Sequence, residues 1–331
     1  MRKLLAVYLL LIALFILFVF QYQNGNQNES ASNKDKLRGS IEENYVMVTH
    51  QAGMDYWKRP LKGFEDAAES LNVSVEYRGT THYDIDEMNA LLEQIIAKKP
   101  AGIAVAPINK NAINAVINKA KEANIPVVLF DTEAPESNAD AFVGTDNYYA
   151  GVEAAHHLAE FIGHTGQVAI MKNKNTDTDS ERVRGFKETI DNQYADIKLI
   201  HIGNGDGDET ISKEATMRII ESFPDLDGVF ATGTTSGVGV AQAIISTDRV
   251  NKTKVISFNI DKPTIDFIDE GIITGTLAQG SWGIGYWSMQ LLFHLEHDLL
   301  LDNNGTVNIP RYVDTGINLI TKENVNNYYM H

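Results

Sequence analysis

The strongest constraint in this chain is an alternation between short apolar runs and longer segments with helical periodicity. From Tyr45 onward, runs rich in β-branched residues are separated by stretches whose apolar residues recur at helical spacing. The predicted strands are residues 45–49, 73–77, 102–107 and 126–131, and the predicted helices between them are residues 60–71, 88–97 and 112–123. Strands that follow one another through a helix run parallel, so this half predicts a parallel sheet.

The same rhythm begins again at Tyr149. The predicted strands of the second half are residues 167–171, 197–202, 228–232 and 254–258, and its predicted helices are residues 149–162, 180–192, 210–222 and 237–245. Two successive arrays with right-handed crossovers predict an α/β fold of two doubly wound parallel-sheet lobes. Ligands bind such sheets outside the carboxyl ends of the strands, so we expect the ligand site in the cleft between the lobes.

An uncharged apolar run, residues 4–20, precedes both lobes, and Arg2 and Lys3 precede the run. The positive-inside bias leaves the N-terminus in the cytoplasm and places the rest of the chain outside it. We predict that residues 1–20 form one transmembrane helix that anchors an extracellular or periplasmic domain to the cell membrane. The alternative is a cleaved signal segment, which would make the protein secreted, but no small-residue cleavage site follows Phe20 directly.

Residues 21–43 are rich in Asn, Gln and Ser and nearly free of apolar side chains. Such a segment buries too little apolar surface to offset the entropy of ordering it. We predict a flexible linker between the anchor and the lobes.

The composition excludes several classes of protein. The chain has no cysteine, which rules out lipoprotein acylation, disulfides and thiolate metal sites. Lys and Arg number 28 against 44 Asp and Glu, and the net charge of −16 opposes nucleic-acid binding, which depends on neutralising phosphates. We predict no nucleic-acid partner.

Motifs for cofactors, metals and catalysis fail at defined positions. The first predicted strand leads to Thr49-His50-Gln51-Ala52-Gly53, which lacks the G-x-G-x-x-G spacing of dinucleotide sites. A loop from Asn204 resembles the start of a calcium site but has Glu209 and Ala215 where Gly and Glu are required. No nucleophile elbow, zinc-protease or P-loop motif occurs. We expect no cofactor, no metal and no catalytic residue.

Four residues near predicted strand ends are candidates for contact with a neutral polyol. Tyr56 and Trp57 follow the first strand, and aromatic faces there can stack on a sugar ring, although one of the two can instead lie in a lobe core. Asp131 ends an apolar strand, and its carboxylate can accept from two hydroxyls. Arg182 should lie near the start of a helix at the cleft, where its planar guanidinium can bind vicinal hydroxyls. The alternative is that Arg182 lies on a solvated face of that helix.

Two further tryptophans, Trp282 and Trp287, fall in the apolar segment GSWGIGYWSMQLLFHL. A helical segment that is apolar on most of its surface is usually buried, so we predict that both pack in a core.

Seven segments, in the right order and at the right spacing, resemble the type I periplasmic sugar-binding proteins of the ribose- and xylose-binding branch. They are IPVVLFDTEAPES (125–137), FVGTDNYYAG (142–151), ERVRGFKETI (181–190), FPDLDGVFATG (223–233), VISFNID (255–261), GTLAQ (275–279) and DTGINLITKENV (314–325). The resemblance extends from Tyr45 to Val325. It implies a two-lobed clamp, with three crossover strands at the hinge, that closes on one sugar.

The resemblance also implies a set of sugar contacts and a division into lobes. By position, the contacts fall on Tyr56, Trp57, Asp131, Asn147, Arg182, Asn259 and Gln279, with Asp206 near a further contact loop. The crossovers fall near Thr145, Gln279 and Asp314, which gives an N-terminal lobe of residues 44–145 plus 281–312 and a C-terminal lobe of residues 146–280 plus 313–325.

Three departures from the ribose binders leave the sugar open. This chain has Thr132 where they have Arg, Gly233-Thr234 where many have Asn-Asp, and Asn259 where they have Asp. These changes alter which hydroxyls of a sugar find a hydrogen-bond partner in the protein. The choice of sugar follows from this, because a buried polar group without a partner costs about 1–3 kcal/mol.

The clamp fits two functions. The first is an extracytoplasmic binding protein that delivers a monosaccharide to an ABC permease. The alternative is a membrane-tethered sensor that reports sugar occupancy to a histidine kinase, which the uncleaved anchor suits. An enzyme acting on a sugar is disfavoured because no nucleophile–base arrangement is present, and a LacI-type repressor because an apolar run stands where a DNA-binding domain would be.

Overall fold

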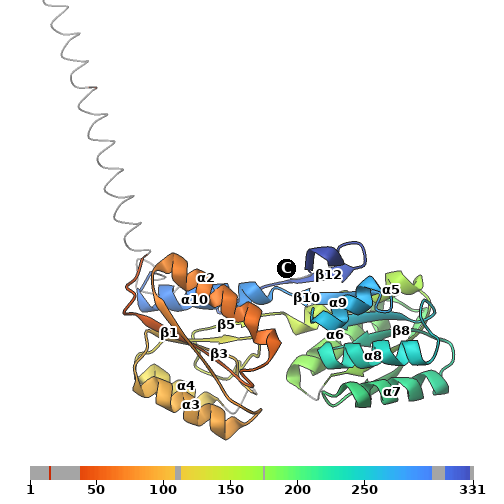
Figure 1. Cartoon of the computed structure of the whole chain (residues 1–331), viewed down its shortest axis with the longest axis horizontal. Coiled ribbons are helices and arrows are strands. Elements are labelled where there is room, and N and C mark those ends of the chain that lie inside the picture. Colours follow the sequence, from red (N-terminus) through yellow and green to blue (C-terminus); the bar gives the residue numbers. More distant parts are fainter. Residues whose placement is uncertain (1–14, 16–37, 109–112, 174–175, 300–309, 329–331) are drawn as a thin grey trace, which may run out of the picture.

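Within residues 15, 38–108, 113–173, 176–299 and 310–328, which the computed structural model describes, the chain forms two six-stranded sheets with helices on both faces (Figure 1). In spatial order, the first sheet contains β11 (Tyr312–Asp314), β5 (Ala141–Gly144), β4 (Val127–Phe130), β3 (Gly102–Val105), β1 (Asn44–Thr49) and β2 (Ser74–Gly79). The second contains β12 (Ile317–Thr321), β10 (Gly275–Gln279), β9 (Lys254–Phe258), β8 (Leu226–Ala231), β6 (Gly166–Lys172) and β7 (Ile197–Asn204). Neighbouring strands are parallel except β12, which is antiparallel to β10.

Each sheet lies between two helical layers. The first lobe has α2 (Lys58–Leu71) and α10 (Ser281–Glu296) on one face, and α3 (Ile85–Ala97) and α4 (Asn114–Glu122) on the other. The second lobe has α5 (Asn147–Ile162) and α6 (Asp177–Gln193) on one face, and α7 (Glu209–Ser222), α8 (Thr234–Ser246) and α9 (Lys262–Asp269) on the other. Short 3₁₀ turns, η1 (Asp55–Trp57) and η2 (Val325–Tyr328), precede α2 and follow β12.

Several helices begin at a residue whose side chain accepts a backbone N–H of the first turn. Asp84, Asp146, Thr176, Asp208 and Asp261 act in this way at the starts of α3, α5, α6, α7 and α9. Such caps satisfy donors that have no partner within the helix and are each worth about 1 kcal/mol.

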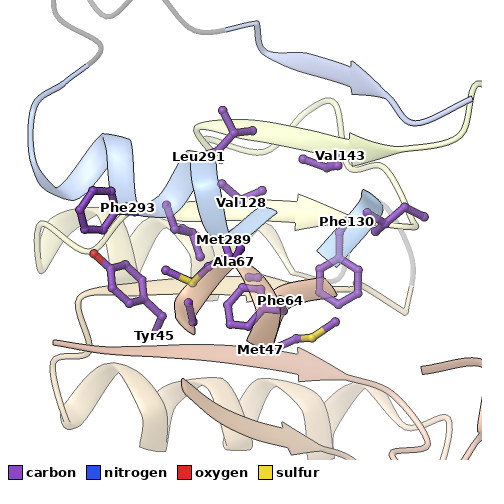
Figure 2. Packing of buried hydrophobic residues seen from close by; sticks show 14 of the residues in the cluster. Tyr45, Met47, Phe64, Ala67, Val128, Phe130, Val143, Met289, Leu291 and Phe293 are labelled. Atoms are coloured by element: carbon purple, nitrogen blue, oxygen red, sulfur yellow. The ribbon is translucent and has the colours of Figure 1, made fainter. Parts of the chain in front are cut away.

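The alternation of side chains along β1 explains the two cores of the first lobe. Tyr45 and Met47 point toward the α2–α10 layer, whereas Val46 and Val48 point toward α3 and α4. Figure 2 shows the first of these cores, where Phe64 of α2 and Met289 and Leu291 of α10 meet Met47, Val128, Phe130 and Val143 of the sheet. Both faces of the sheet are therefore buried, as expected for parallel strands.

The described chain passes between the sheets at three places. It leaves the first sheet after β5 to form α5, returns after β10 to form α10, and crosses again between β11 and β12. The predicted lobe boundary after residue 312 falls two residues early, because Val313 and Asp314 still pair with Val143 and Gly144 in the first sheet.

Two glycines let α2 and α10 approach each other closely. A Cβ on Gly63 would lie 1.9 Å from the Trp282 carbonyl oxygen, and one on Gly285 would lie 1.7 Å from the Pro60 carbonyl oxygen. The second lobe repeats this contact between α5 and α6 with Gly151 and Gly185. In each lobe, therefore, a helix that follows a strand of the other sheet packs against a helix of the same lobe. These pairs are α10 with α2 and α5 with α6.

Two sequence predictions concern apolar segments. The prediction that Trp282 and Trp287 pack in a core is wrong: their side chains are 44% and 49% exposed, because α10 turns Ile284, Met289 and Phe293 inward instead. In the part of the chain that the structure describes, no helix has the length and apolar content to cross a membrane. The predicted anchor and linker lie outside the described residues except for Phe15 and residues 38–43.

Candidate functional site

The two lobes place a polar residue at equivalent strand ends. Asp131 follows β4 and Asn259 follows β9, and both adopt left-handed backbone conformations, with φ of 63° and 75°. Their N–H groups donate to the Val143 and Leu277 carbonyls at 3.1 and 2.9 Å. Asp and Asn are the non-glycine residues that best tolerate this conformation, so the backbone turn itself favours a short polar side chain at each carboxyl edge.

Gln279 links the first lobe, the second lobe and a crossover. Its Nε2 donates to Asn259 Oδ1 at 2.8 Å and lies 3.5 Å from the Tyr56 hydroxyl, and its Oε1 accepts from Thr145 Oγ1 at 2.9 Å. The Tyr56 hydroxyl in turn donates to the Asp131 carboxylate. Four of the predicted site residues therefore form one hydrogen-bonded chain across the molecule.

Tyr56 stays a hydrogen-bond donor in this chain. Burial raises the pKa of Tyr56 well above its ordinary value, and the neighbouring charge of Asp131 raises it further. The phenol is therefore protonated at neutral pH and holds the Asp131 carboxylate in place.

Arg182 is a buried cation in the second lobe. It lies on α6 with only 6% of its surface exposed, and its guanidinium stacks 3.5 Å from the centre of the Phe258 ring. Nε donates to Asn147 Oδ1 at 2.9 Å, and Nη1 donates to the Thr232 carbonyl at 2.7 Å. Among the described residues neither bond uses Nη2, which remains the free arm of the fork.

The charges around Arg182 come from both lobes. Burial lowers the pKa of Arg182, while the negative charges of Asp179 and Asp131 and the Tyr56 phenol oppose that change. Asp131 belongs to the first lobe, and its carboxylate is near enough to raise the pKa of the Arg182 guanidinium in the second. A cation of one lobe and an anion of the other thus lie within electrostatic range of each other.

Sequence reasoning missed a polar network beneath Arg182. Asp179, 5% exposed, accepts from the hydroxyls of Thr176, at 2.7 Å, and Thr232. Thr232 Oγ1 also accepts the Asn173 N–H at 2.9 Å, and Asn173 Oδ1 accepts the Ser236 N–H at 3.1 Å. Thr176 and Asp179 have the spacing of a capping box, which was the available signal for this network.

Trp57 lies in the core of the first lobe instead of at the cleft surface. Its side chain is 2% exposed, and its Nε1 donates to the His50 carbonyl at 2.8 Å. It packs edge-to-face against Phe130 and Tyr56, with ring centroids 6.0 and 4.8 Å apart. Trp57 therefore supports Tyr56 from behind, which matches the alternative of one core aromatic.

Tyr83, in the loop after β2, is an aromatic side chain at the cleft that sequence reasoning missed. Its hydroxyl donates to the Ile108 carbonyl at 2.6 Å, and its ring meets His50 edge-to-face at 4.8 Å. Burial raises the pKa of Tyr83, and the charges of Asp131 and Asp179 add to that effect. Asp131 follows a strand of the first lobe and Asp179 lies in the second, so the pKa of Tyr83 responds to charges of both lobes.

Asp206 stands apart from these residues. It is exposed on the turn after β7, with φ of 50°, and its N–H donates to Asn204 Oδ1 at 3.2 Å. The turn packs on the end of β6 through the Gly205 N–H, which donates to the Lys172 carbonyl at 2.8 Å. Asp206 therefore lies at the rim of the same sheet edge, and no hydrogen bond found among the described residues joins its carboxylate to the other candidates.

The amino-acid sequence matches a known protein family. The periplasmic binding protein domain matches residues 45–297, which is most of the chain. The chain belongs to this family. The two lobes, the hinge crossovers and the cleft at the strand ends are the parts that the resemblance of the sequence implied.

Relatives of this periplasmic binding protein bind sugars. The D-allose-binding periplasmic protein of Escherichia coli is 25% identical over 76% of this chain and 84% of its own length. A sugar-binding protein of a Bacillus halodurans sugar ABC transporter is 48% identical, with a TM-score of 0.84 and coverage of 87% and 100% of the two chains. The arabinose-binding protein AraP of Geobacillus stearothermophilus is 51% identical, with a TM-score of 0.83 and coverage of 87% and 99%.

These findings make the chain a sugar-binding protein whose globular part lies outside the cytoplasm. Its relatives are binding proteins and not enzymes. This agrees with a set of strand-end side chains that offers hydrogen-bond donors and acceptors at fixed positions.

Proposed function

We propose that the protein captures one arabinose-like monosaccharide in the cleft and delivers it to an ABC permease. The observation that carries this proposal is the opposed pair of Asp131 and Arg182, which offers a charged acceptor and a charged donor to one small ligand from two lobes. A sugar hydroxyl is both donor and acceptor, so it can bond to either side. The similarity to an arabinose-binding protein at 51% identity supports the sugar class.

In this proposal each predicted residue except the buried Trp57 has a defined role. Asp131 accepts from two hydroxyls while Tyr56 steadies it, and Nη2 of Arg182 donates to a hydroxyl or the ring oxygen. The amides of Asn147, Asn259 and Gln279 are already oriented by neighbours in the structure and complete the set. Tyr83 contributes its ring, and Asp206 contacts the ligand only after the lobes close.

Isothermal titration calorimetry with arabinose, ribose, allose and sucrose tests this function. We expect one of the three monosaccharides to bind in the micromolar range, about −8 kcal/mol, and the disaccharide sucrose to bind at least tenfold more weakly than that monosaccharide. Failure of every monosaccharide to bind more tightly than about 1 mM would contradict the proposal.

A membrane-tethered sensor is the second candidate, and the apolar run of residues 4–20 supports it. Both candidates require the same sugar site and differ in the partner that reads occupancy. Co-purification of the sugar-loaded full chain with a permease supports uptake, and co-purification with a histidine kinase supports sensing.

A further inference from the structure

The outer face of the α2–α10 helix pair carries exposed aromatic side chains. Trp282 and Trp287 of α10 keep 44% and 49% of their surface in solvent, and Tyr286 lies between them. The Tyr286 ring stacks on Trp282 at 4.7 Å and meets Trp287 edge-to-face at 5.5 Å. Three adjoining aromatic rings at a surface are typical of an interaction site, because each gains free energy when water is excluded from it.

The charges on α2 beside these rings are divided along the helix. Its first half carries Lys58, Arg59 and Lys62, and its second half carries Glu65, Asp66 and Glu69. Lys58 pairs with the exposed Asp55, and Lys62 pairs with Asp66, whose carboxylate also accepts from Trp282 Nε1 at 2.9 Å. Such pairs are worth about 0–1 kcal/mol each, so a partner can replace them at little cost.

The equivalent face of the second lobe lacks this pattern. There the guanidinium of Arg184 lies 4.1 Å from the centre of the Tyr148 ring, and the Tyr148 hydroxyl donates to Glu188 at 2.8 Å. Arg184 also pairs with Glu181 at 2.5 Å. On this face Arg184 covers the Tyr148 ring, whereas on the α2–α10 face the rings of Trp282 and Trp287 stay exposed, although the two helix pairs are built on the same glycine contact.

We propose that the aromatic and charged face formed by α2 and α10 is the interface of a two-fold homodimer. Figure 1 shows these two helices side by side on the outside of the first lobe. A two-fold axis near the middle of α2 places the α2 helices of two copies antiparallel to each other. The cationic half of each α2 helix then lies against the acidic half of the other. The same operation brings the aromatic rings of the copies together beside the charges.

A second copy fits this face better than a partner of one charge sign. The three cations and three carboxylates of α2 balance each other, so a uniformly acidic or basic surface would meet repulsion along half of the helix. The whole chain carries a net charge of −16, which repels copies in other orientations. The balanced face is where two copies can meet without that repulsion.

The absence of cysteine from the sequence allows a clean cross-linking test on the full chain in its membrane. Glu65→Cys places a thiol two residues after Gly63, near the proposed axis, and Lys187→Cys places one two residues after Gly185, at the matched exposed position of the second lobe. With a short bismaleimide we expect Glu65→Cys to give at least tenfold more linked dimer than Lys187→Cys. Equal yields from the two variants would overturn the proposal.

A charge exchange tests the antiparallel arrangement. Lys58→Glu with Lys62→Glu, and separately Glu65→Lys with Glu69→Lys, should each lower self-association at least tenfold, measured by co-purification of two differently tagged copies. Mixing the two variants should restore pairing, because each then meets its opposite charge. Unchanged melting temperatures establish that the variants fold, and failure of the mixture to pair refutes the arrangement.

Substituting Trp287 by Gln removes an exposed aromatic side chain without opening a core. We expect this variant to lose at least tenfold in self-association, while Tyr149→Gln, a substitution of a 50% exposed aromatic on α5, changes nothing. A wild-type protein that binds lipid vesicles through its tryptophans but does not self-associate would also overturn the homodimer.

Discussion

The two lobes share a frame but differ in the chemistry that each brings to the cleft. Both sheets have the same strand order, both hold a crossing helix against a glycine pair, and both place a left-handed polar residue at one strand end. The first lobe contributes aromatic rings around the carboxylate of Asp131, whereas the second contributes the buried, hydrogen-bonded cation Arg182. The topology therefore determines where these side chains lie, and the residue types at a few positions give the two lobes different chemistry.

The lobes also differ in how their charged groups are held. Arg182 is bonded to Asn147 and the Thr232 carbonyl and stacks on Phe258, so its position is set before any ligand arrives. Asp131 is held by the Tyr56 hydroxyl. The second lobe is thus the more preorganised half of the site.

The largest effect should follow removal of the cation. Arg182→Ala deletes the charged donor and leaves Asp179 as a buried carboxylate without that compensating charge, so we expect sugar affinity to fall at least 100-fold, about 2.7 kcal/mol, and the protein to lose stability. The exposed Arg184→Ala is the control and should bind normally. Calorimetry and thermal unfolding measure the two effects, and normal binding by Arg182→Ala would exclude it from the site.

The shared helix contact should respond equally in both lobes. Gly63→Ala and Gly185→Ala each force a Cβ to within about 2 Å of a backbone carbonyl, so we expect each to destabilise the protein by roughly 1–3 kcal/mol or more. Gly53→Ala, where a Cβ has nothing within 4 Å, is the control. Urea unfolding checks this, and a loss confined to one lobe would show that the two contacts are not equivalent.

Exchanging Asp and Asn at the two strand ends should weaken the contribution of the first lobe to sugar binding and leave that of the second lobe unchanged. Asp131→Asn keeps the left-handed turn but removes a charged acceptor, so we expect affinity to fall roughly tenfold, about 1.4 kcal/mol, with little change in stability. Asn259→Asp leaves the first lobe intact but replaces the Nδ2 donor to Thr234. A double exchange that restored wild-type affinity would contradict distinct roles for the lobes.

The smallest expected effect concerns the Tyr56 hydroxyl. Because burial raises the pKa of Tyr56, its contribution to stability is complete below the ordinary pKa of 10.0 and is lost as pH rises above it. Tyr56→Phe should weaken sugar binding by about 1 kcal/mol and make unfolding less sensitive to pH above about 10. Unfolding measured from pH 8 to 11 tests this, and parallel curves for the two proteins would rule it out.

The sequence predicted the frame well because local patterns encode it. The alternation of strands and helices, and the strand-end positions of Asp131 and Asn259, follow from periodicity that neighbouring residues carry. The structure also bonds Gln279 to Asn259 and Asn147 to Arg182. The roles of these residues in binding remain predictions.

What the sequence did not predict depends on contacts between distant segments. The network under Arg182 joins Asp179 to Thr232 across 53 residues, and no local pattern encodes that pairing. Trp282 and Trp287 were predicted wrongly for a related reason: an apolar segment indicates that some of its side chains are buried, but the neighbouring elements decide which ones. Both tryptophans lie partly in solvent, whereas Trp57 lies in a core, as the alternative prediction for it stated.

The exchange of helices between the lobes has a consequence for how the protein is made. The first lobe is complete only when α10 and β11 arrive, and these follow β5 after every strand of the second sheet except β12. At ordinary rates of synthesis, roughly 170 residues take about 10 to 30 s to emerge. For most of that interval the first lobe lacks one helix of its core, and until its end the first sheet lacks its edge strand, so the nascent first lobe cannot reach its final packing before nearly all of the second has been synthesised.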